Sequence, residues 1–159
     1  MALRQARREK MTKTNEKTED QPRAGYSPEF LTHALTPQNV GLMSNPDGYG
    51  APQGECGDMM EIGLRVRDGR IDNINFITDG CAFTVACGSV VTTLAKGRTV
   101  AEVLEIKAED IISVLGGLPP EHEHCARLAV DTLRLAVKDY LKNRAAPWKK
   151  LYQPAGRPR

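Results

Sequence analysis

Apolar and polar side chains alternate most regularly in the middle of the chain. Residues 60–67 alternate with a period of two, and residues 74–78 continue the alternation. Such alternation predicts β-strands that are apolar on one face. Asp68-Gly69 lies between the two segments and is typical of a tight type I′ turn. The pattern therefore predicts an antiparallel hairpin, and other parts of the chain must cover its apolar face.

The second half of the chain has the wider apolar spacing that is typical of helices. Helices are expected in residues 82–95, 100–104 and 108–115, followed by a long helix that ends near residue 143. Thr99 and Glu102 have the spacing of a capping box. Before the hairpin, Ser27-Pro28 predicts the start of a short helix that stops before Pro37. These helices are the expected cover for the hairpin.

The two ends of the chain lack this patterning. Residues 1–24 are rich in charge and poor in apolar side chains, which favours a disordered N-terminal extension, and their acidic residues argue against a mitochondrial presequence. Residues 144–159 contain three prolines and are expected to form a C-terminal tail. Residues 25–143 are therefore expected to form one domain. Within it, residues 36–55 form a long Gly/Pro-rich loop of a kind that often has a function.

Composition excludes several classes of function. The chain has 159 residues and a net charge of +2, so nothing in it requires nucleic acid or an acidic membrane surface. It has neither a membrane-spanning apolar run nor the apolar segment of a secretory signal. A cytoplasmic location is expected. In that environment the 4 cysteines are more consistent with thiols or metal ligands than with disulfides.

Three thiols, one imidazole and one carboxylate lie where loops meet predicted strands or helices. Cys56 and Asp58 precede the hairpin, Cys81 follows it, and His124-Cys125 precedes the longest helix. Soft sulfur ligands suit iron–sulfur clusters and zinc, whereas a carboxylate is a harder and weaker ligand for both. A weak oxygen ligand is useful when a bound metal group has to leave. The set predicts a site for a metal or a metal–sulfur cluster.

The spacing alone leaves alternatives open. Each cysteine taken singly could be a small buried hydrophobe, and the absence of a Cys-x-x-Cys pair argues against a zinc ribbon. Cys87 follows Cys81 by six positions (87 − 81), which is roughly 240° around a helix. Cys87 is therefore expected in the core. His122 is interpreted as a solvated loop histidine.

Helix starts are expected to activate two of the thiols. Cys81 and Cys125 both lie near predicted helix N-termini, where the helix dipole favours the thiolate form. For Cys125, the preceding glycine and proline pairs predict a mobile, exposed thiol with a lowered pKa. Cys125 is accordingly expected to react before Cys56 and Cys81.

Several segments, taken in order, resemble the IscU/NifU-type iron–sulfur cluster assembly scaffolds, the NifU N-terminal domain family. They are Thr36-Pro37-Gln38-Asn39-Val40-Gly41, Gly54-Glu55-Cys56-Gly57-Asp58, Asp68-Gly69, Gly80-Cys81, Gly97, and Leu118-Pro119-Pro120 leading to His124-Cys125. The resemblance covers roughly residues 25–143. It implies an α+β fold with a small antiparallel three-stranded sheet and helices packed on one face. The third strand is then expected within residues 78–80 or 42–56.

The resemblance also implies a role for each site residue. Cys56, Cys81 and Cys125 resemble the cluster ligands of the family. Asp58 resembles the residue that makes the cluster labile. His124 resembles an alternative ligand beside Cys125. Cys125 resembles the acceptor of sulfur from a cysteine desulfurase. The protein would then be a platform and not an enzyme. It would receive sulfur and iron, hold a transient [2Fe–2S] or [4Fe–4S] cluster, and hand it on.

The implied partners are a cysteine desulfurase, iron or electron donor proteins, and recipient apo-proteins; a homodimer is compatible with the resemblance, and neither nucleic acid nor a membrane is expected. The stretch Leu118-Pro119-Pro120-Glu121-His122 departs from the Leu-Pro-Pro-Val-Lys of members that use an Hsp70-type chaperone, so recognition by such a chaperone is in doubt.

Two other classes of function stay open. One is a zinc-bound sulfur acceptor that stimulates a desulfurase, because the same residues can bind zinc in the apo-like form. The insertion typical of that branch is absent, since Cys81 and Cys125 are 44 positions apart (125 − 81). The other is an interaction module with inert, buried cysteines.

Overall fold

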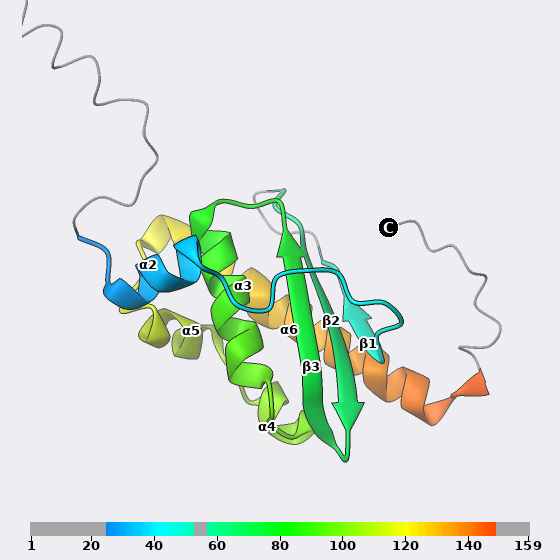
Figure 1. Cartoon of the computed structure of the whole chain (residues 1–159). Helices are drawn as coiled ribbons and strands as arrows, with labels where there is room; N and C mark the ends of the chain where they lie inside the picture. Colours follow the sequence, from blue (N-terminus) through cyan, green and yellow to red (C-terminus); the bar gives the residue numbers. More distant parts are fainter. Residues whose placement is uncertain (1–24, 53–56, 149–159) are drawn as a thin grey trace, which may run out of the picture.

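The computed structural model describes residues 25–52 and 57–148. Its centre is an antiparallel sheet with the order β1-β2-β3, shown in Figure 1. The strands are β1 (Gly48–Gly50), β2 (Met60–Arg67) and β3 (Arg70–Thr78). The helices are α2 (Pro28–Leu35), α3 (Ala82–Ala95), α4 (Val100–Leu104), α5 (Ala108–Val114) and α6 (Glu123–Ala145), with a 3₁₀ turn η1 (Pro120–His122) before α6. The third strand lies in the second of the two expected segments, residues 42–56.

The predicted hairpin is confirmed. Strands β2 and β3 pair antiparallel, and the turn between them has positive φ at Asp68 (54°) and Gly69 (74°), as a type I′ turn requires. The apolar side chains alternate onto one buried face, where each is at most 1% exposed: Met60, Ile62, Leu64, Ile74 and Phe76. A period of two in the sequence therefore becomes one face of the core.

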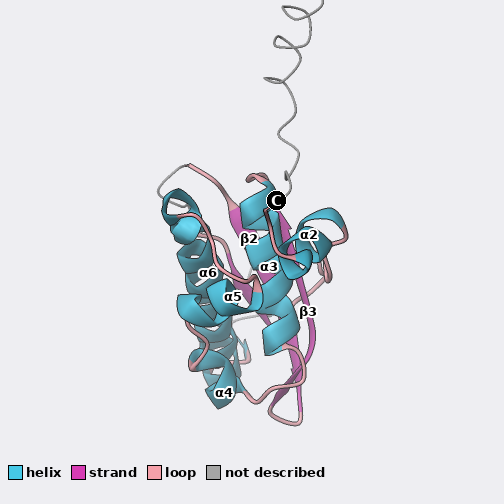
Figure 2. Cartoon of the chain, turned by 90° about the vertical axis from the view of Figure 1, so that its left-hand side faces the viewer, coloured by secondary structure: helices cyan, strands magenta, loops and turns pink. Residues whose placement is uncertain are grey.

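The helices lie on one face of this sheet, as the α+β prediction required. Figure 2 shows the helices in front of the strands, and α3 and α6 contact the sheet directly. Helix α2 packs on α3, and α5 packs on α6. The capping signals are confirmed as well. The Ser27 hydroxyl accepts a hydrogen bond from Phe30 N at 3.0 Å, and Thr99 and Glu102 form the capping box.

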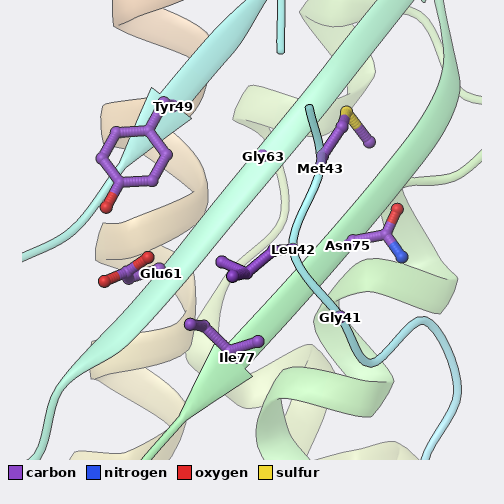
Figure 3. Close-up of a pocket in the computed structure, with 8 residues that line it drawn as sticks. All are labelled: Gly41, Leu42, Met43, Tyr49, Glu61, Gly63, Asn75 and Ile77. Atoms are coloured by element: carbon purple, nitrogen blue, oxygen red, sulfur yellow. The ribbon is translucent and has the colours of Figure 1, made fainter. Parts of the chain in front are cut away.

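The opposite face of the sheet is crossed by the loop before β1. Val40 forms a parallel bridge with Phe76, and Gly41 N donates to Phe76 O at 2.9 Å. Figure 3 shows the small hollow between this loop and the sheet. Its lining residues are Gly41, Leu42, Met43, Tyr49, Glu61, Gly63, Asn75 and Ile77. None of the predicted site residues lines this hollow.

Of the two predicted tails, the structure describes only residues 144–148. Residues 1–24 and 149–159 lie outside the described residues, so the N-terminal extension and most of the C-terminal tail stay predictions. Helix α6 extends to Ala145, two residues beyond the expected end at 143. None of the helices in the described part of the chain has the length and apolar character that crossing a membrane requires.

Glycines set the distance between the helices and the sheet. A Cβ atom added to Gly50 would lie 2.6 Å from Ala136 N and from Thr132 O, both in the backbone of α6. A Cβ atom on Gly48 would lie 2.2 Å from Ala136 O, and one on Gly88 would lie 2.4 Å from the Phe76 ring. Because real Cβ atoms do not approach other atoms this closely, α6 and α3 can pack against the sheet at these positions only with glycine.

We predict that Gly50→Ala lowers the free energy of unfolding by about 1–3 kcal/mol, the usual cost of overpacking a rigid interior. Gly63→Ala is the matched control in the adjacent strand. Its Cβ would be 3.2 Å from Met43 Cβ on the looser face of the sheet, so we expect a smaller loss of under about 1 kcal/mol. Chemical denaturation of both variants measures the difference. Equal losses would show that the close contact of β1 with α6 does not constrain the fold.

Candidate metal and sulfur site

The N-termini of α3 and α6 lie near each other at one end of the sheet, and they carry the two described cysteines of the predicted site. Cys81 is the N-cap residue of α3, and Cys125 lies in the first turn of α6. The Sγ atoms of Cys81 and Cys125 and one ring nitrogen of His122 all lie within 4.8 Å of one another. Two thiols and one imidazole are therefore close enough to hold one metal ion.

Hydrogen bonds at the end of the hairpin hold the Asp58 segment beside Cys81. Met59 N donates to Asp79 Oδ1 at 2.8 Å, and the Thr78 hydroxyl donates to Met59 O at 2.6 Å. Residue 58 directly precedes this contact and residue 81 follows it by two positions. The open end of the hairpin therefore places Asp58 near the start of α3, but Asp58 is not part of the close group of Cys81, His122 and Cys125.

Thr84 links three of the predicted site residues. Its side chain is fully buried, and its Oγ1 lies 3.3 Å from Asp58 Oδ2, 3.4 Å from Cys125 Sγ and 3.7 Å from Cys81 Sγ. A hydroxyl has one proton to donate, so Asp58 and Cys125 compete for it, whereas between Thr84 and Cys81 either side chain could be the donor. Thr84 was not among the site residues predicted from the sequence. The sequence feature that could have indicated Thr84 is its position three residues after Cys81, because this spacing places both residues on the same side of the helix start.

Cys125 differs from its sequence prediction. The side chain is 0% exposed, and burial raises the pKa of its thiol to about 11. The hydrogen bond from Thr84 acts in the opposite direction and lowers the pKa, but less than burial raises it. The expectation of an exposed thiol with a lowered pKa is therefore wrong for this conformation, because desolvation outweighs the helix N-terminus. Cys81 is the exposed thiol of the pair.

The two histidines occupy different positions. His124 Nε2 lies 3.6 Å from Cys125 Sγ, but His124 is not part of the close group formed by Cys81, His122 and Cys125. His122 is half-buried, and its ring stacks on Phe83 with a centroid distance of 3.7 Å and an interplanar angle of 10°. The interpretation of His122 as a solvated loop residue is therefore wrong.

Of the other two cysteines, the structure describes only Cys87. Cys56 lies outside the described residues, so its place in the site stays a prediction. Cys87 is 0% exposed and belongs to the hydrophobic core, as its position on the helix predicted. Burial raises the pKa of the Cys87 thiol far above its usual range, which makes it a poor metal ligand.

The fold and the donor set together define a small α+β domain with a group of thiols and imidazole that could hold a metal ion. Residues 25–147 match the model of the NifU-like N-terminal domain, and the chain belongs to this family. The chain is 42% identical over 118 residues to the iron–sulfur cluster assembly scaffold protein IscU 1 of Archaeoglobus fulgidus, a match that covers 74% of this chain and 77% of the relative. It is 37% identical over 119 residues to the scaffold protein IscU of Aquifex aeolicus, covering 73% and 76%.

Solved structures support the same fold. The N-terminal NifU-like protein of Brucella abortus superposes with a TM-score of 0.59 at 18% identity, covering 73% of this chain and 94% of that one. A candidate scaffold for the SUF system from Fervidobacterium islandicum superposes with a TM-score of 0.62 at 22% identity, covering 70% and 96%. At these identities the likeness establishes the fold alone.

We predict that Cys81 of the metal-free protein is alkylated by iodoacetamide at least about tenfold faster than Cys125 at pH 8. Cys81 is exposed, whereas a buried thiol with a pKa of about 11 is ionised in only about one molecule in a thousand at this pH. Between pH 8 and pH 10 the Cys125 rate should rise about tenfold per pH unit, because only the thiolate reacts. Mass mapping of quenched samples measures both rates, and equal rates at pH 8 would contradict the buried position of Cys125.

We further predict that Thr84→Val lowers the Cys125 alkylation rate at a given pH by about tenfold. The variant keeps the side-chain shape but removes a donor that favours the thiolate, and hydrogen bonds to charged groups contribute about 1.5 kcal/mol or more. Thr93→Val is the matched control in the same helix, because Thr93 Oγ1 donates to Ser89 O. If both variants alter the Cys125 alkylation rate equally, the hydrogen bond from Thr84 does not stabilise the Cys125 thiolate.

Proposed function

We propose that this protein is a scaffold on which iron–sulfur clusters are assembled from iron and desulfurase-derived sulfur and then passed to apo-proteins. The observation that carries the proposal is the convergence of Cys81, His122 and Cys125 within 4.8 Å, in a chain that is 42% identical to an iron–sulfur cluster assembly scaffold protein. The cluster is the cargo of this site. The protein is accordingly a platform and does not turn over a substrate.

The donor chemistry fits this cargo. Thiolate sulfur is the usual ligand of iron in such clusters, and imidazole can replace it. Cys81 and Cys125 supply two thiols, and Cys56 is proposed as the third. Asp58 lies beside them through Thr84 and offers the weaker oxygen ligand that favours release. The proposed cargo is a [2Fe–2S] cluster, with [4Fe–4S] as the alternative form.

We propose Cys125 as the sulfur acceptor. Because its side chain is buried, the segment before α6 must move before Cys125 can react. The segment before α6 contains Gly116 and Gly117, both with positive φ (73° and 104°), and ends in the turn η1. Displacement of this segment would expose Cys125. Its thiolate then attacks the outer sulfur of the desulfurase persulfide, a new S–S bond forms, and the desulfurase cysteine leaves as thiolate.

The partners follow from this role. They are a cysteine desulfurase, iron or electron donor proteins, and recipient apo-proteins. Zinc binding in the absence of iron is compatible with the same ligands. The alternative of a zinc-bound sulfur acceptor is less well supported, because the relatives of about 40% identity are named as assembly scaffolds. The cytoplasmic location expected from the sequence stays a prediction.

Anaerobic reconstitution with ferrous iron and sulfide tests the proposal. We expect the parent protein to become red-brown, with visible absorbance and a Mössbauer spectrum of an iron–sulfur cluster. Cys81→Ala should lose at least most of this absorbance, because it removes a ligand. Cys87→Ala is the matched control and should retain it, because Cys87 belongs to the core. A parent protein that stays colourless would refute the scaffold role, and loss in Cys87→Ala alone would refute the ligand assignment.

A further inference from the structure

We propose that His122 is a metal ligand of this chain and that, with Cys81 and Cys125, it binds a single thiophilic divalent cation such as Zn²⁺ before a cluster is built. The inference rests on the proposed function only in assuming that iron and sulfide enter the same site later. Neither the family match nor the names of the relatives assign a role to His122. The sequence resemblance points instead to His124.

The first support is position. One ring nitrogen of His122 and the two Sγ atoms form the group in which every ligand atom lies within 4.8 Å of the others. Within the described residues, this is the one set of three or more such side chains close enough to share an ion. His124 approaches Cys125 Sγ at 3.6 Å but is outside this set.

The second support is the fixed orientation of the ring. His122 lies flat against Phe83, which stands two residues after Cys81 in the first turn of α3. Phe83 in turn packs against Tyr26 and Phe30, with ring centroids 5.7 Å and 5.0 Å away. The stack joins α2, α3 and η1 and restricts rotation of the imidazole. A ligand that is held in place before the metal arrives loses little entropy on binding.

The third support is an unsatisfied nitrogen. Among the described residues, His122 Nδ1 is the single buried side-chain nitrogen or oxygen without a hydrogen-bond partner. Burying such a group without a partner is unfavourable, because the group loses its hydrogen bonds to water and gains none in the protein. In the proposed site the metal ion is bound through Nδ1, which would give this nitrogen its partner, because an imidazole nitrogen is a common ligand of zinc alongside thiolates.

Three protein ligands leave a further position on a tetrahedral metal ion. In zinc sites with three protein ligands, the open position accepts water or another exchangeable ligand. Asp58 supplies a carboxylate that is linked to Cys125 through the Thr84 hydroxyl. Among the described residues no third thiol joins this group, and a site left open in this way suits an ion that is later replaced or incorporated.

The test compares two matched variants of the full-length, metal-free protein, His122→Phe and His124→Phe. Phenylalanine retains a ring that can stack on Phe83 but has no nitrogen, so His122→Phe removes the ligand with little change in packing. Competition with a chromophoric chelator measures the affinity for Zn²⁺, and X-ray absorption at the zinc edge reports imidazole coordination. Thermal unfolding of both metal-free variants checks that each is folded.

We expect His122→Phe to weaken Zn²⁺ binding by more than about 100-fold and to remove the imidazole signal. A loss of this size exceeds the roughly 10–100-fold loss seen when a residue that only supports a metal ligand is removed. His124→Phe should change the affinity by less than about tenfold and retain the signal. An unchanged affinity in His122→Phe, or an equal or larger loss in His124→Phe, overturns the inference. A parent protein that assembles a cluster while His122→Phe binds Zn²⁺ normally refutes this inference but not the scaffold role. A parent that assembles no cluster refutes the scaffold role.

Discussion

The close contact between the backbone of α6 and that of β1 is the constraint on which the site depends. Gly48 and Gly50 permit it, because any side chain there would overlap the α6 backbone at Ala136. Gly88 allows a similar approach of α3 to Phe76. With both helices fixed against one face of the sheet, their N-termini lie together, and Cys81 and Cys125 come within bonding reach of one metal ion. The chemistry of the site is therefore a consequence of how tightly the helices pack.

The same packing makes the two thiols unequal. Cys81 is at the surface, whereas Cys125 is fully buried beside Thr84, and its pKa is raised to about 11. A buried, protonated thiol is protected from oxidation, and a metal ion that displaces its proton would convert it to the ligand form. The Thr84 hydroxyl, within 3.4 Å of both Asp58 and Cys125, connects the carboxylate that is proposed as the weak oxygen ligand to the buried sulfur. We therefore propose that binding and release of the cluster both involve the hydrogen-bonded group of Asp58, Thr84 and Cys125.

Much of the fold was predictable because its signals are local. The alternation in residues 60–67 and the Asp68-Gly69 turn determine the hairpin, and Thr99 with Glu102 determines a helix start. Strand β1 has only three residues, Gly-Tyr-Gly, so no alternation could reveal it. The family resemblance implied that a third strand exists but left two segments open for it, residues 78–80 and 42–56.

The site was predictable in type but not in detail. Cysteine spacing identified the thiols, but the burial of Cys125 depends on tertiary contacts that no local pattern contains. Thr84 has no metal-ligand chemistry of its own, and its role arises from neighbours 26 and 41 positions away. His122 was misjudged because its environment is the ring of Phe83, 39 positions earlier (122 − 83), and not the loop in which it lies.

The central claim is that the chain holds a cluster and hands it on intact. The most direct measurement mixes the anaerobically loaded protein with an apo-ferredoxin, follows the circular dichroism of the recipient, and includes a ferrous chelator in solution. The account predicts that the recipient gains its cluster while the chelator captures little iron, and that Asp58→Ala slows the transfer because it removes the weak oxygen ligand. If the chelator abolishes loading of the recipient, the protein releases free iron instead, and the scaffold account is contradicted.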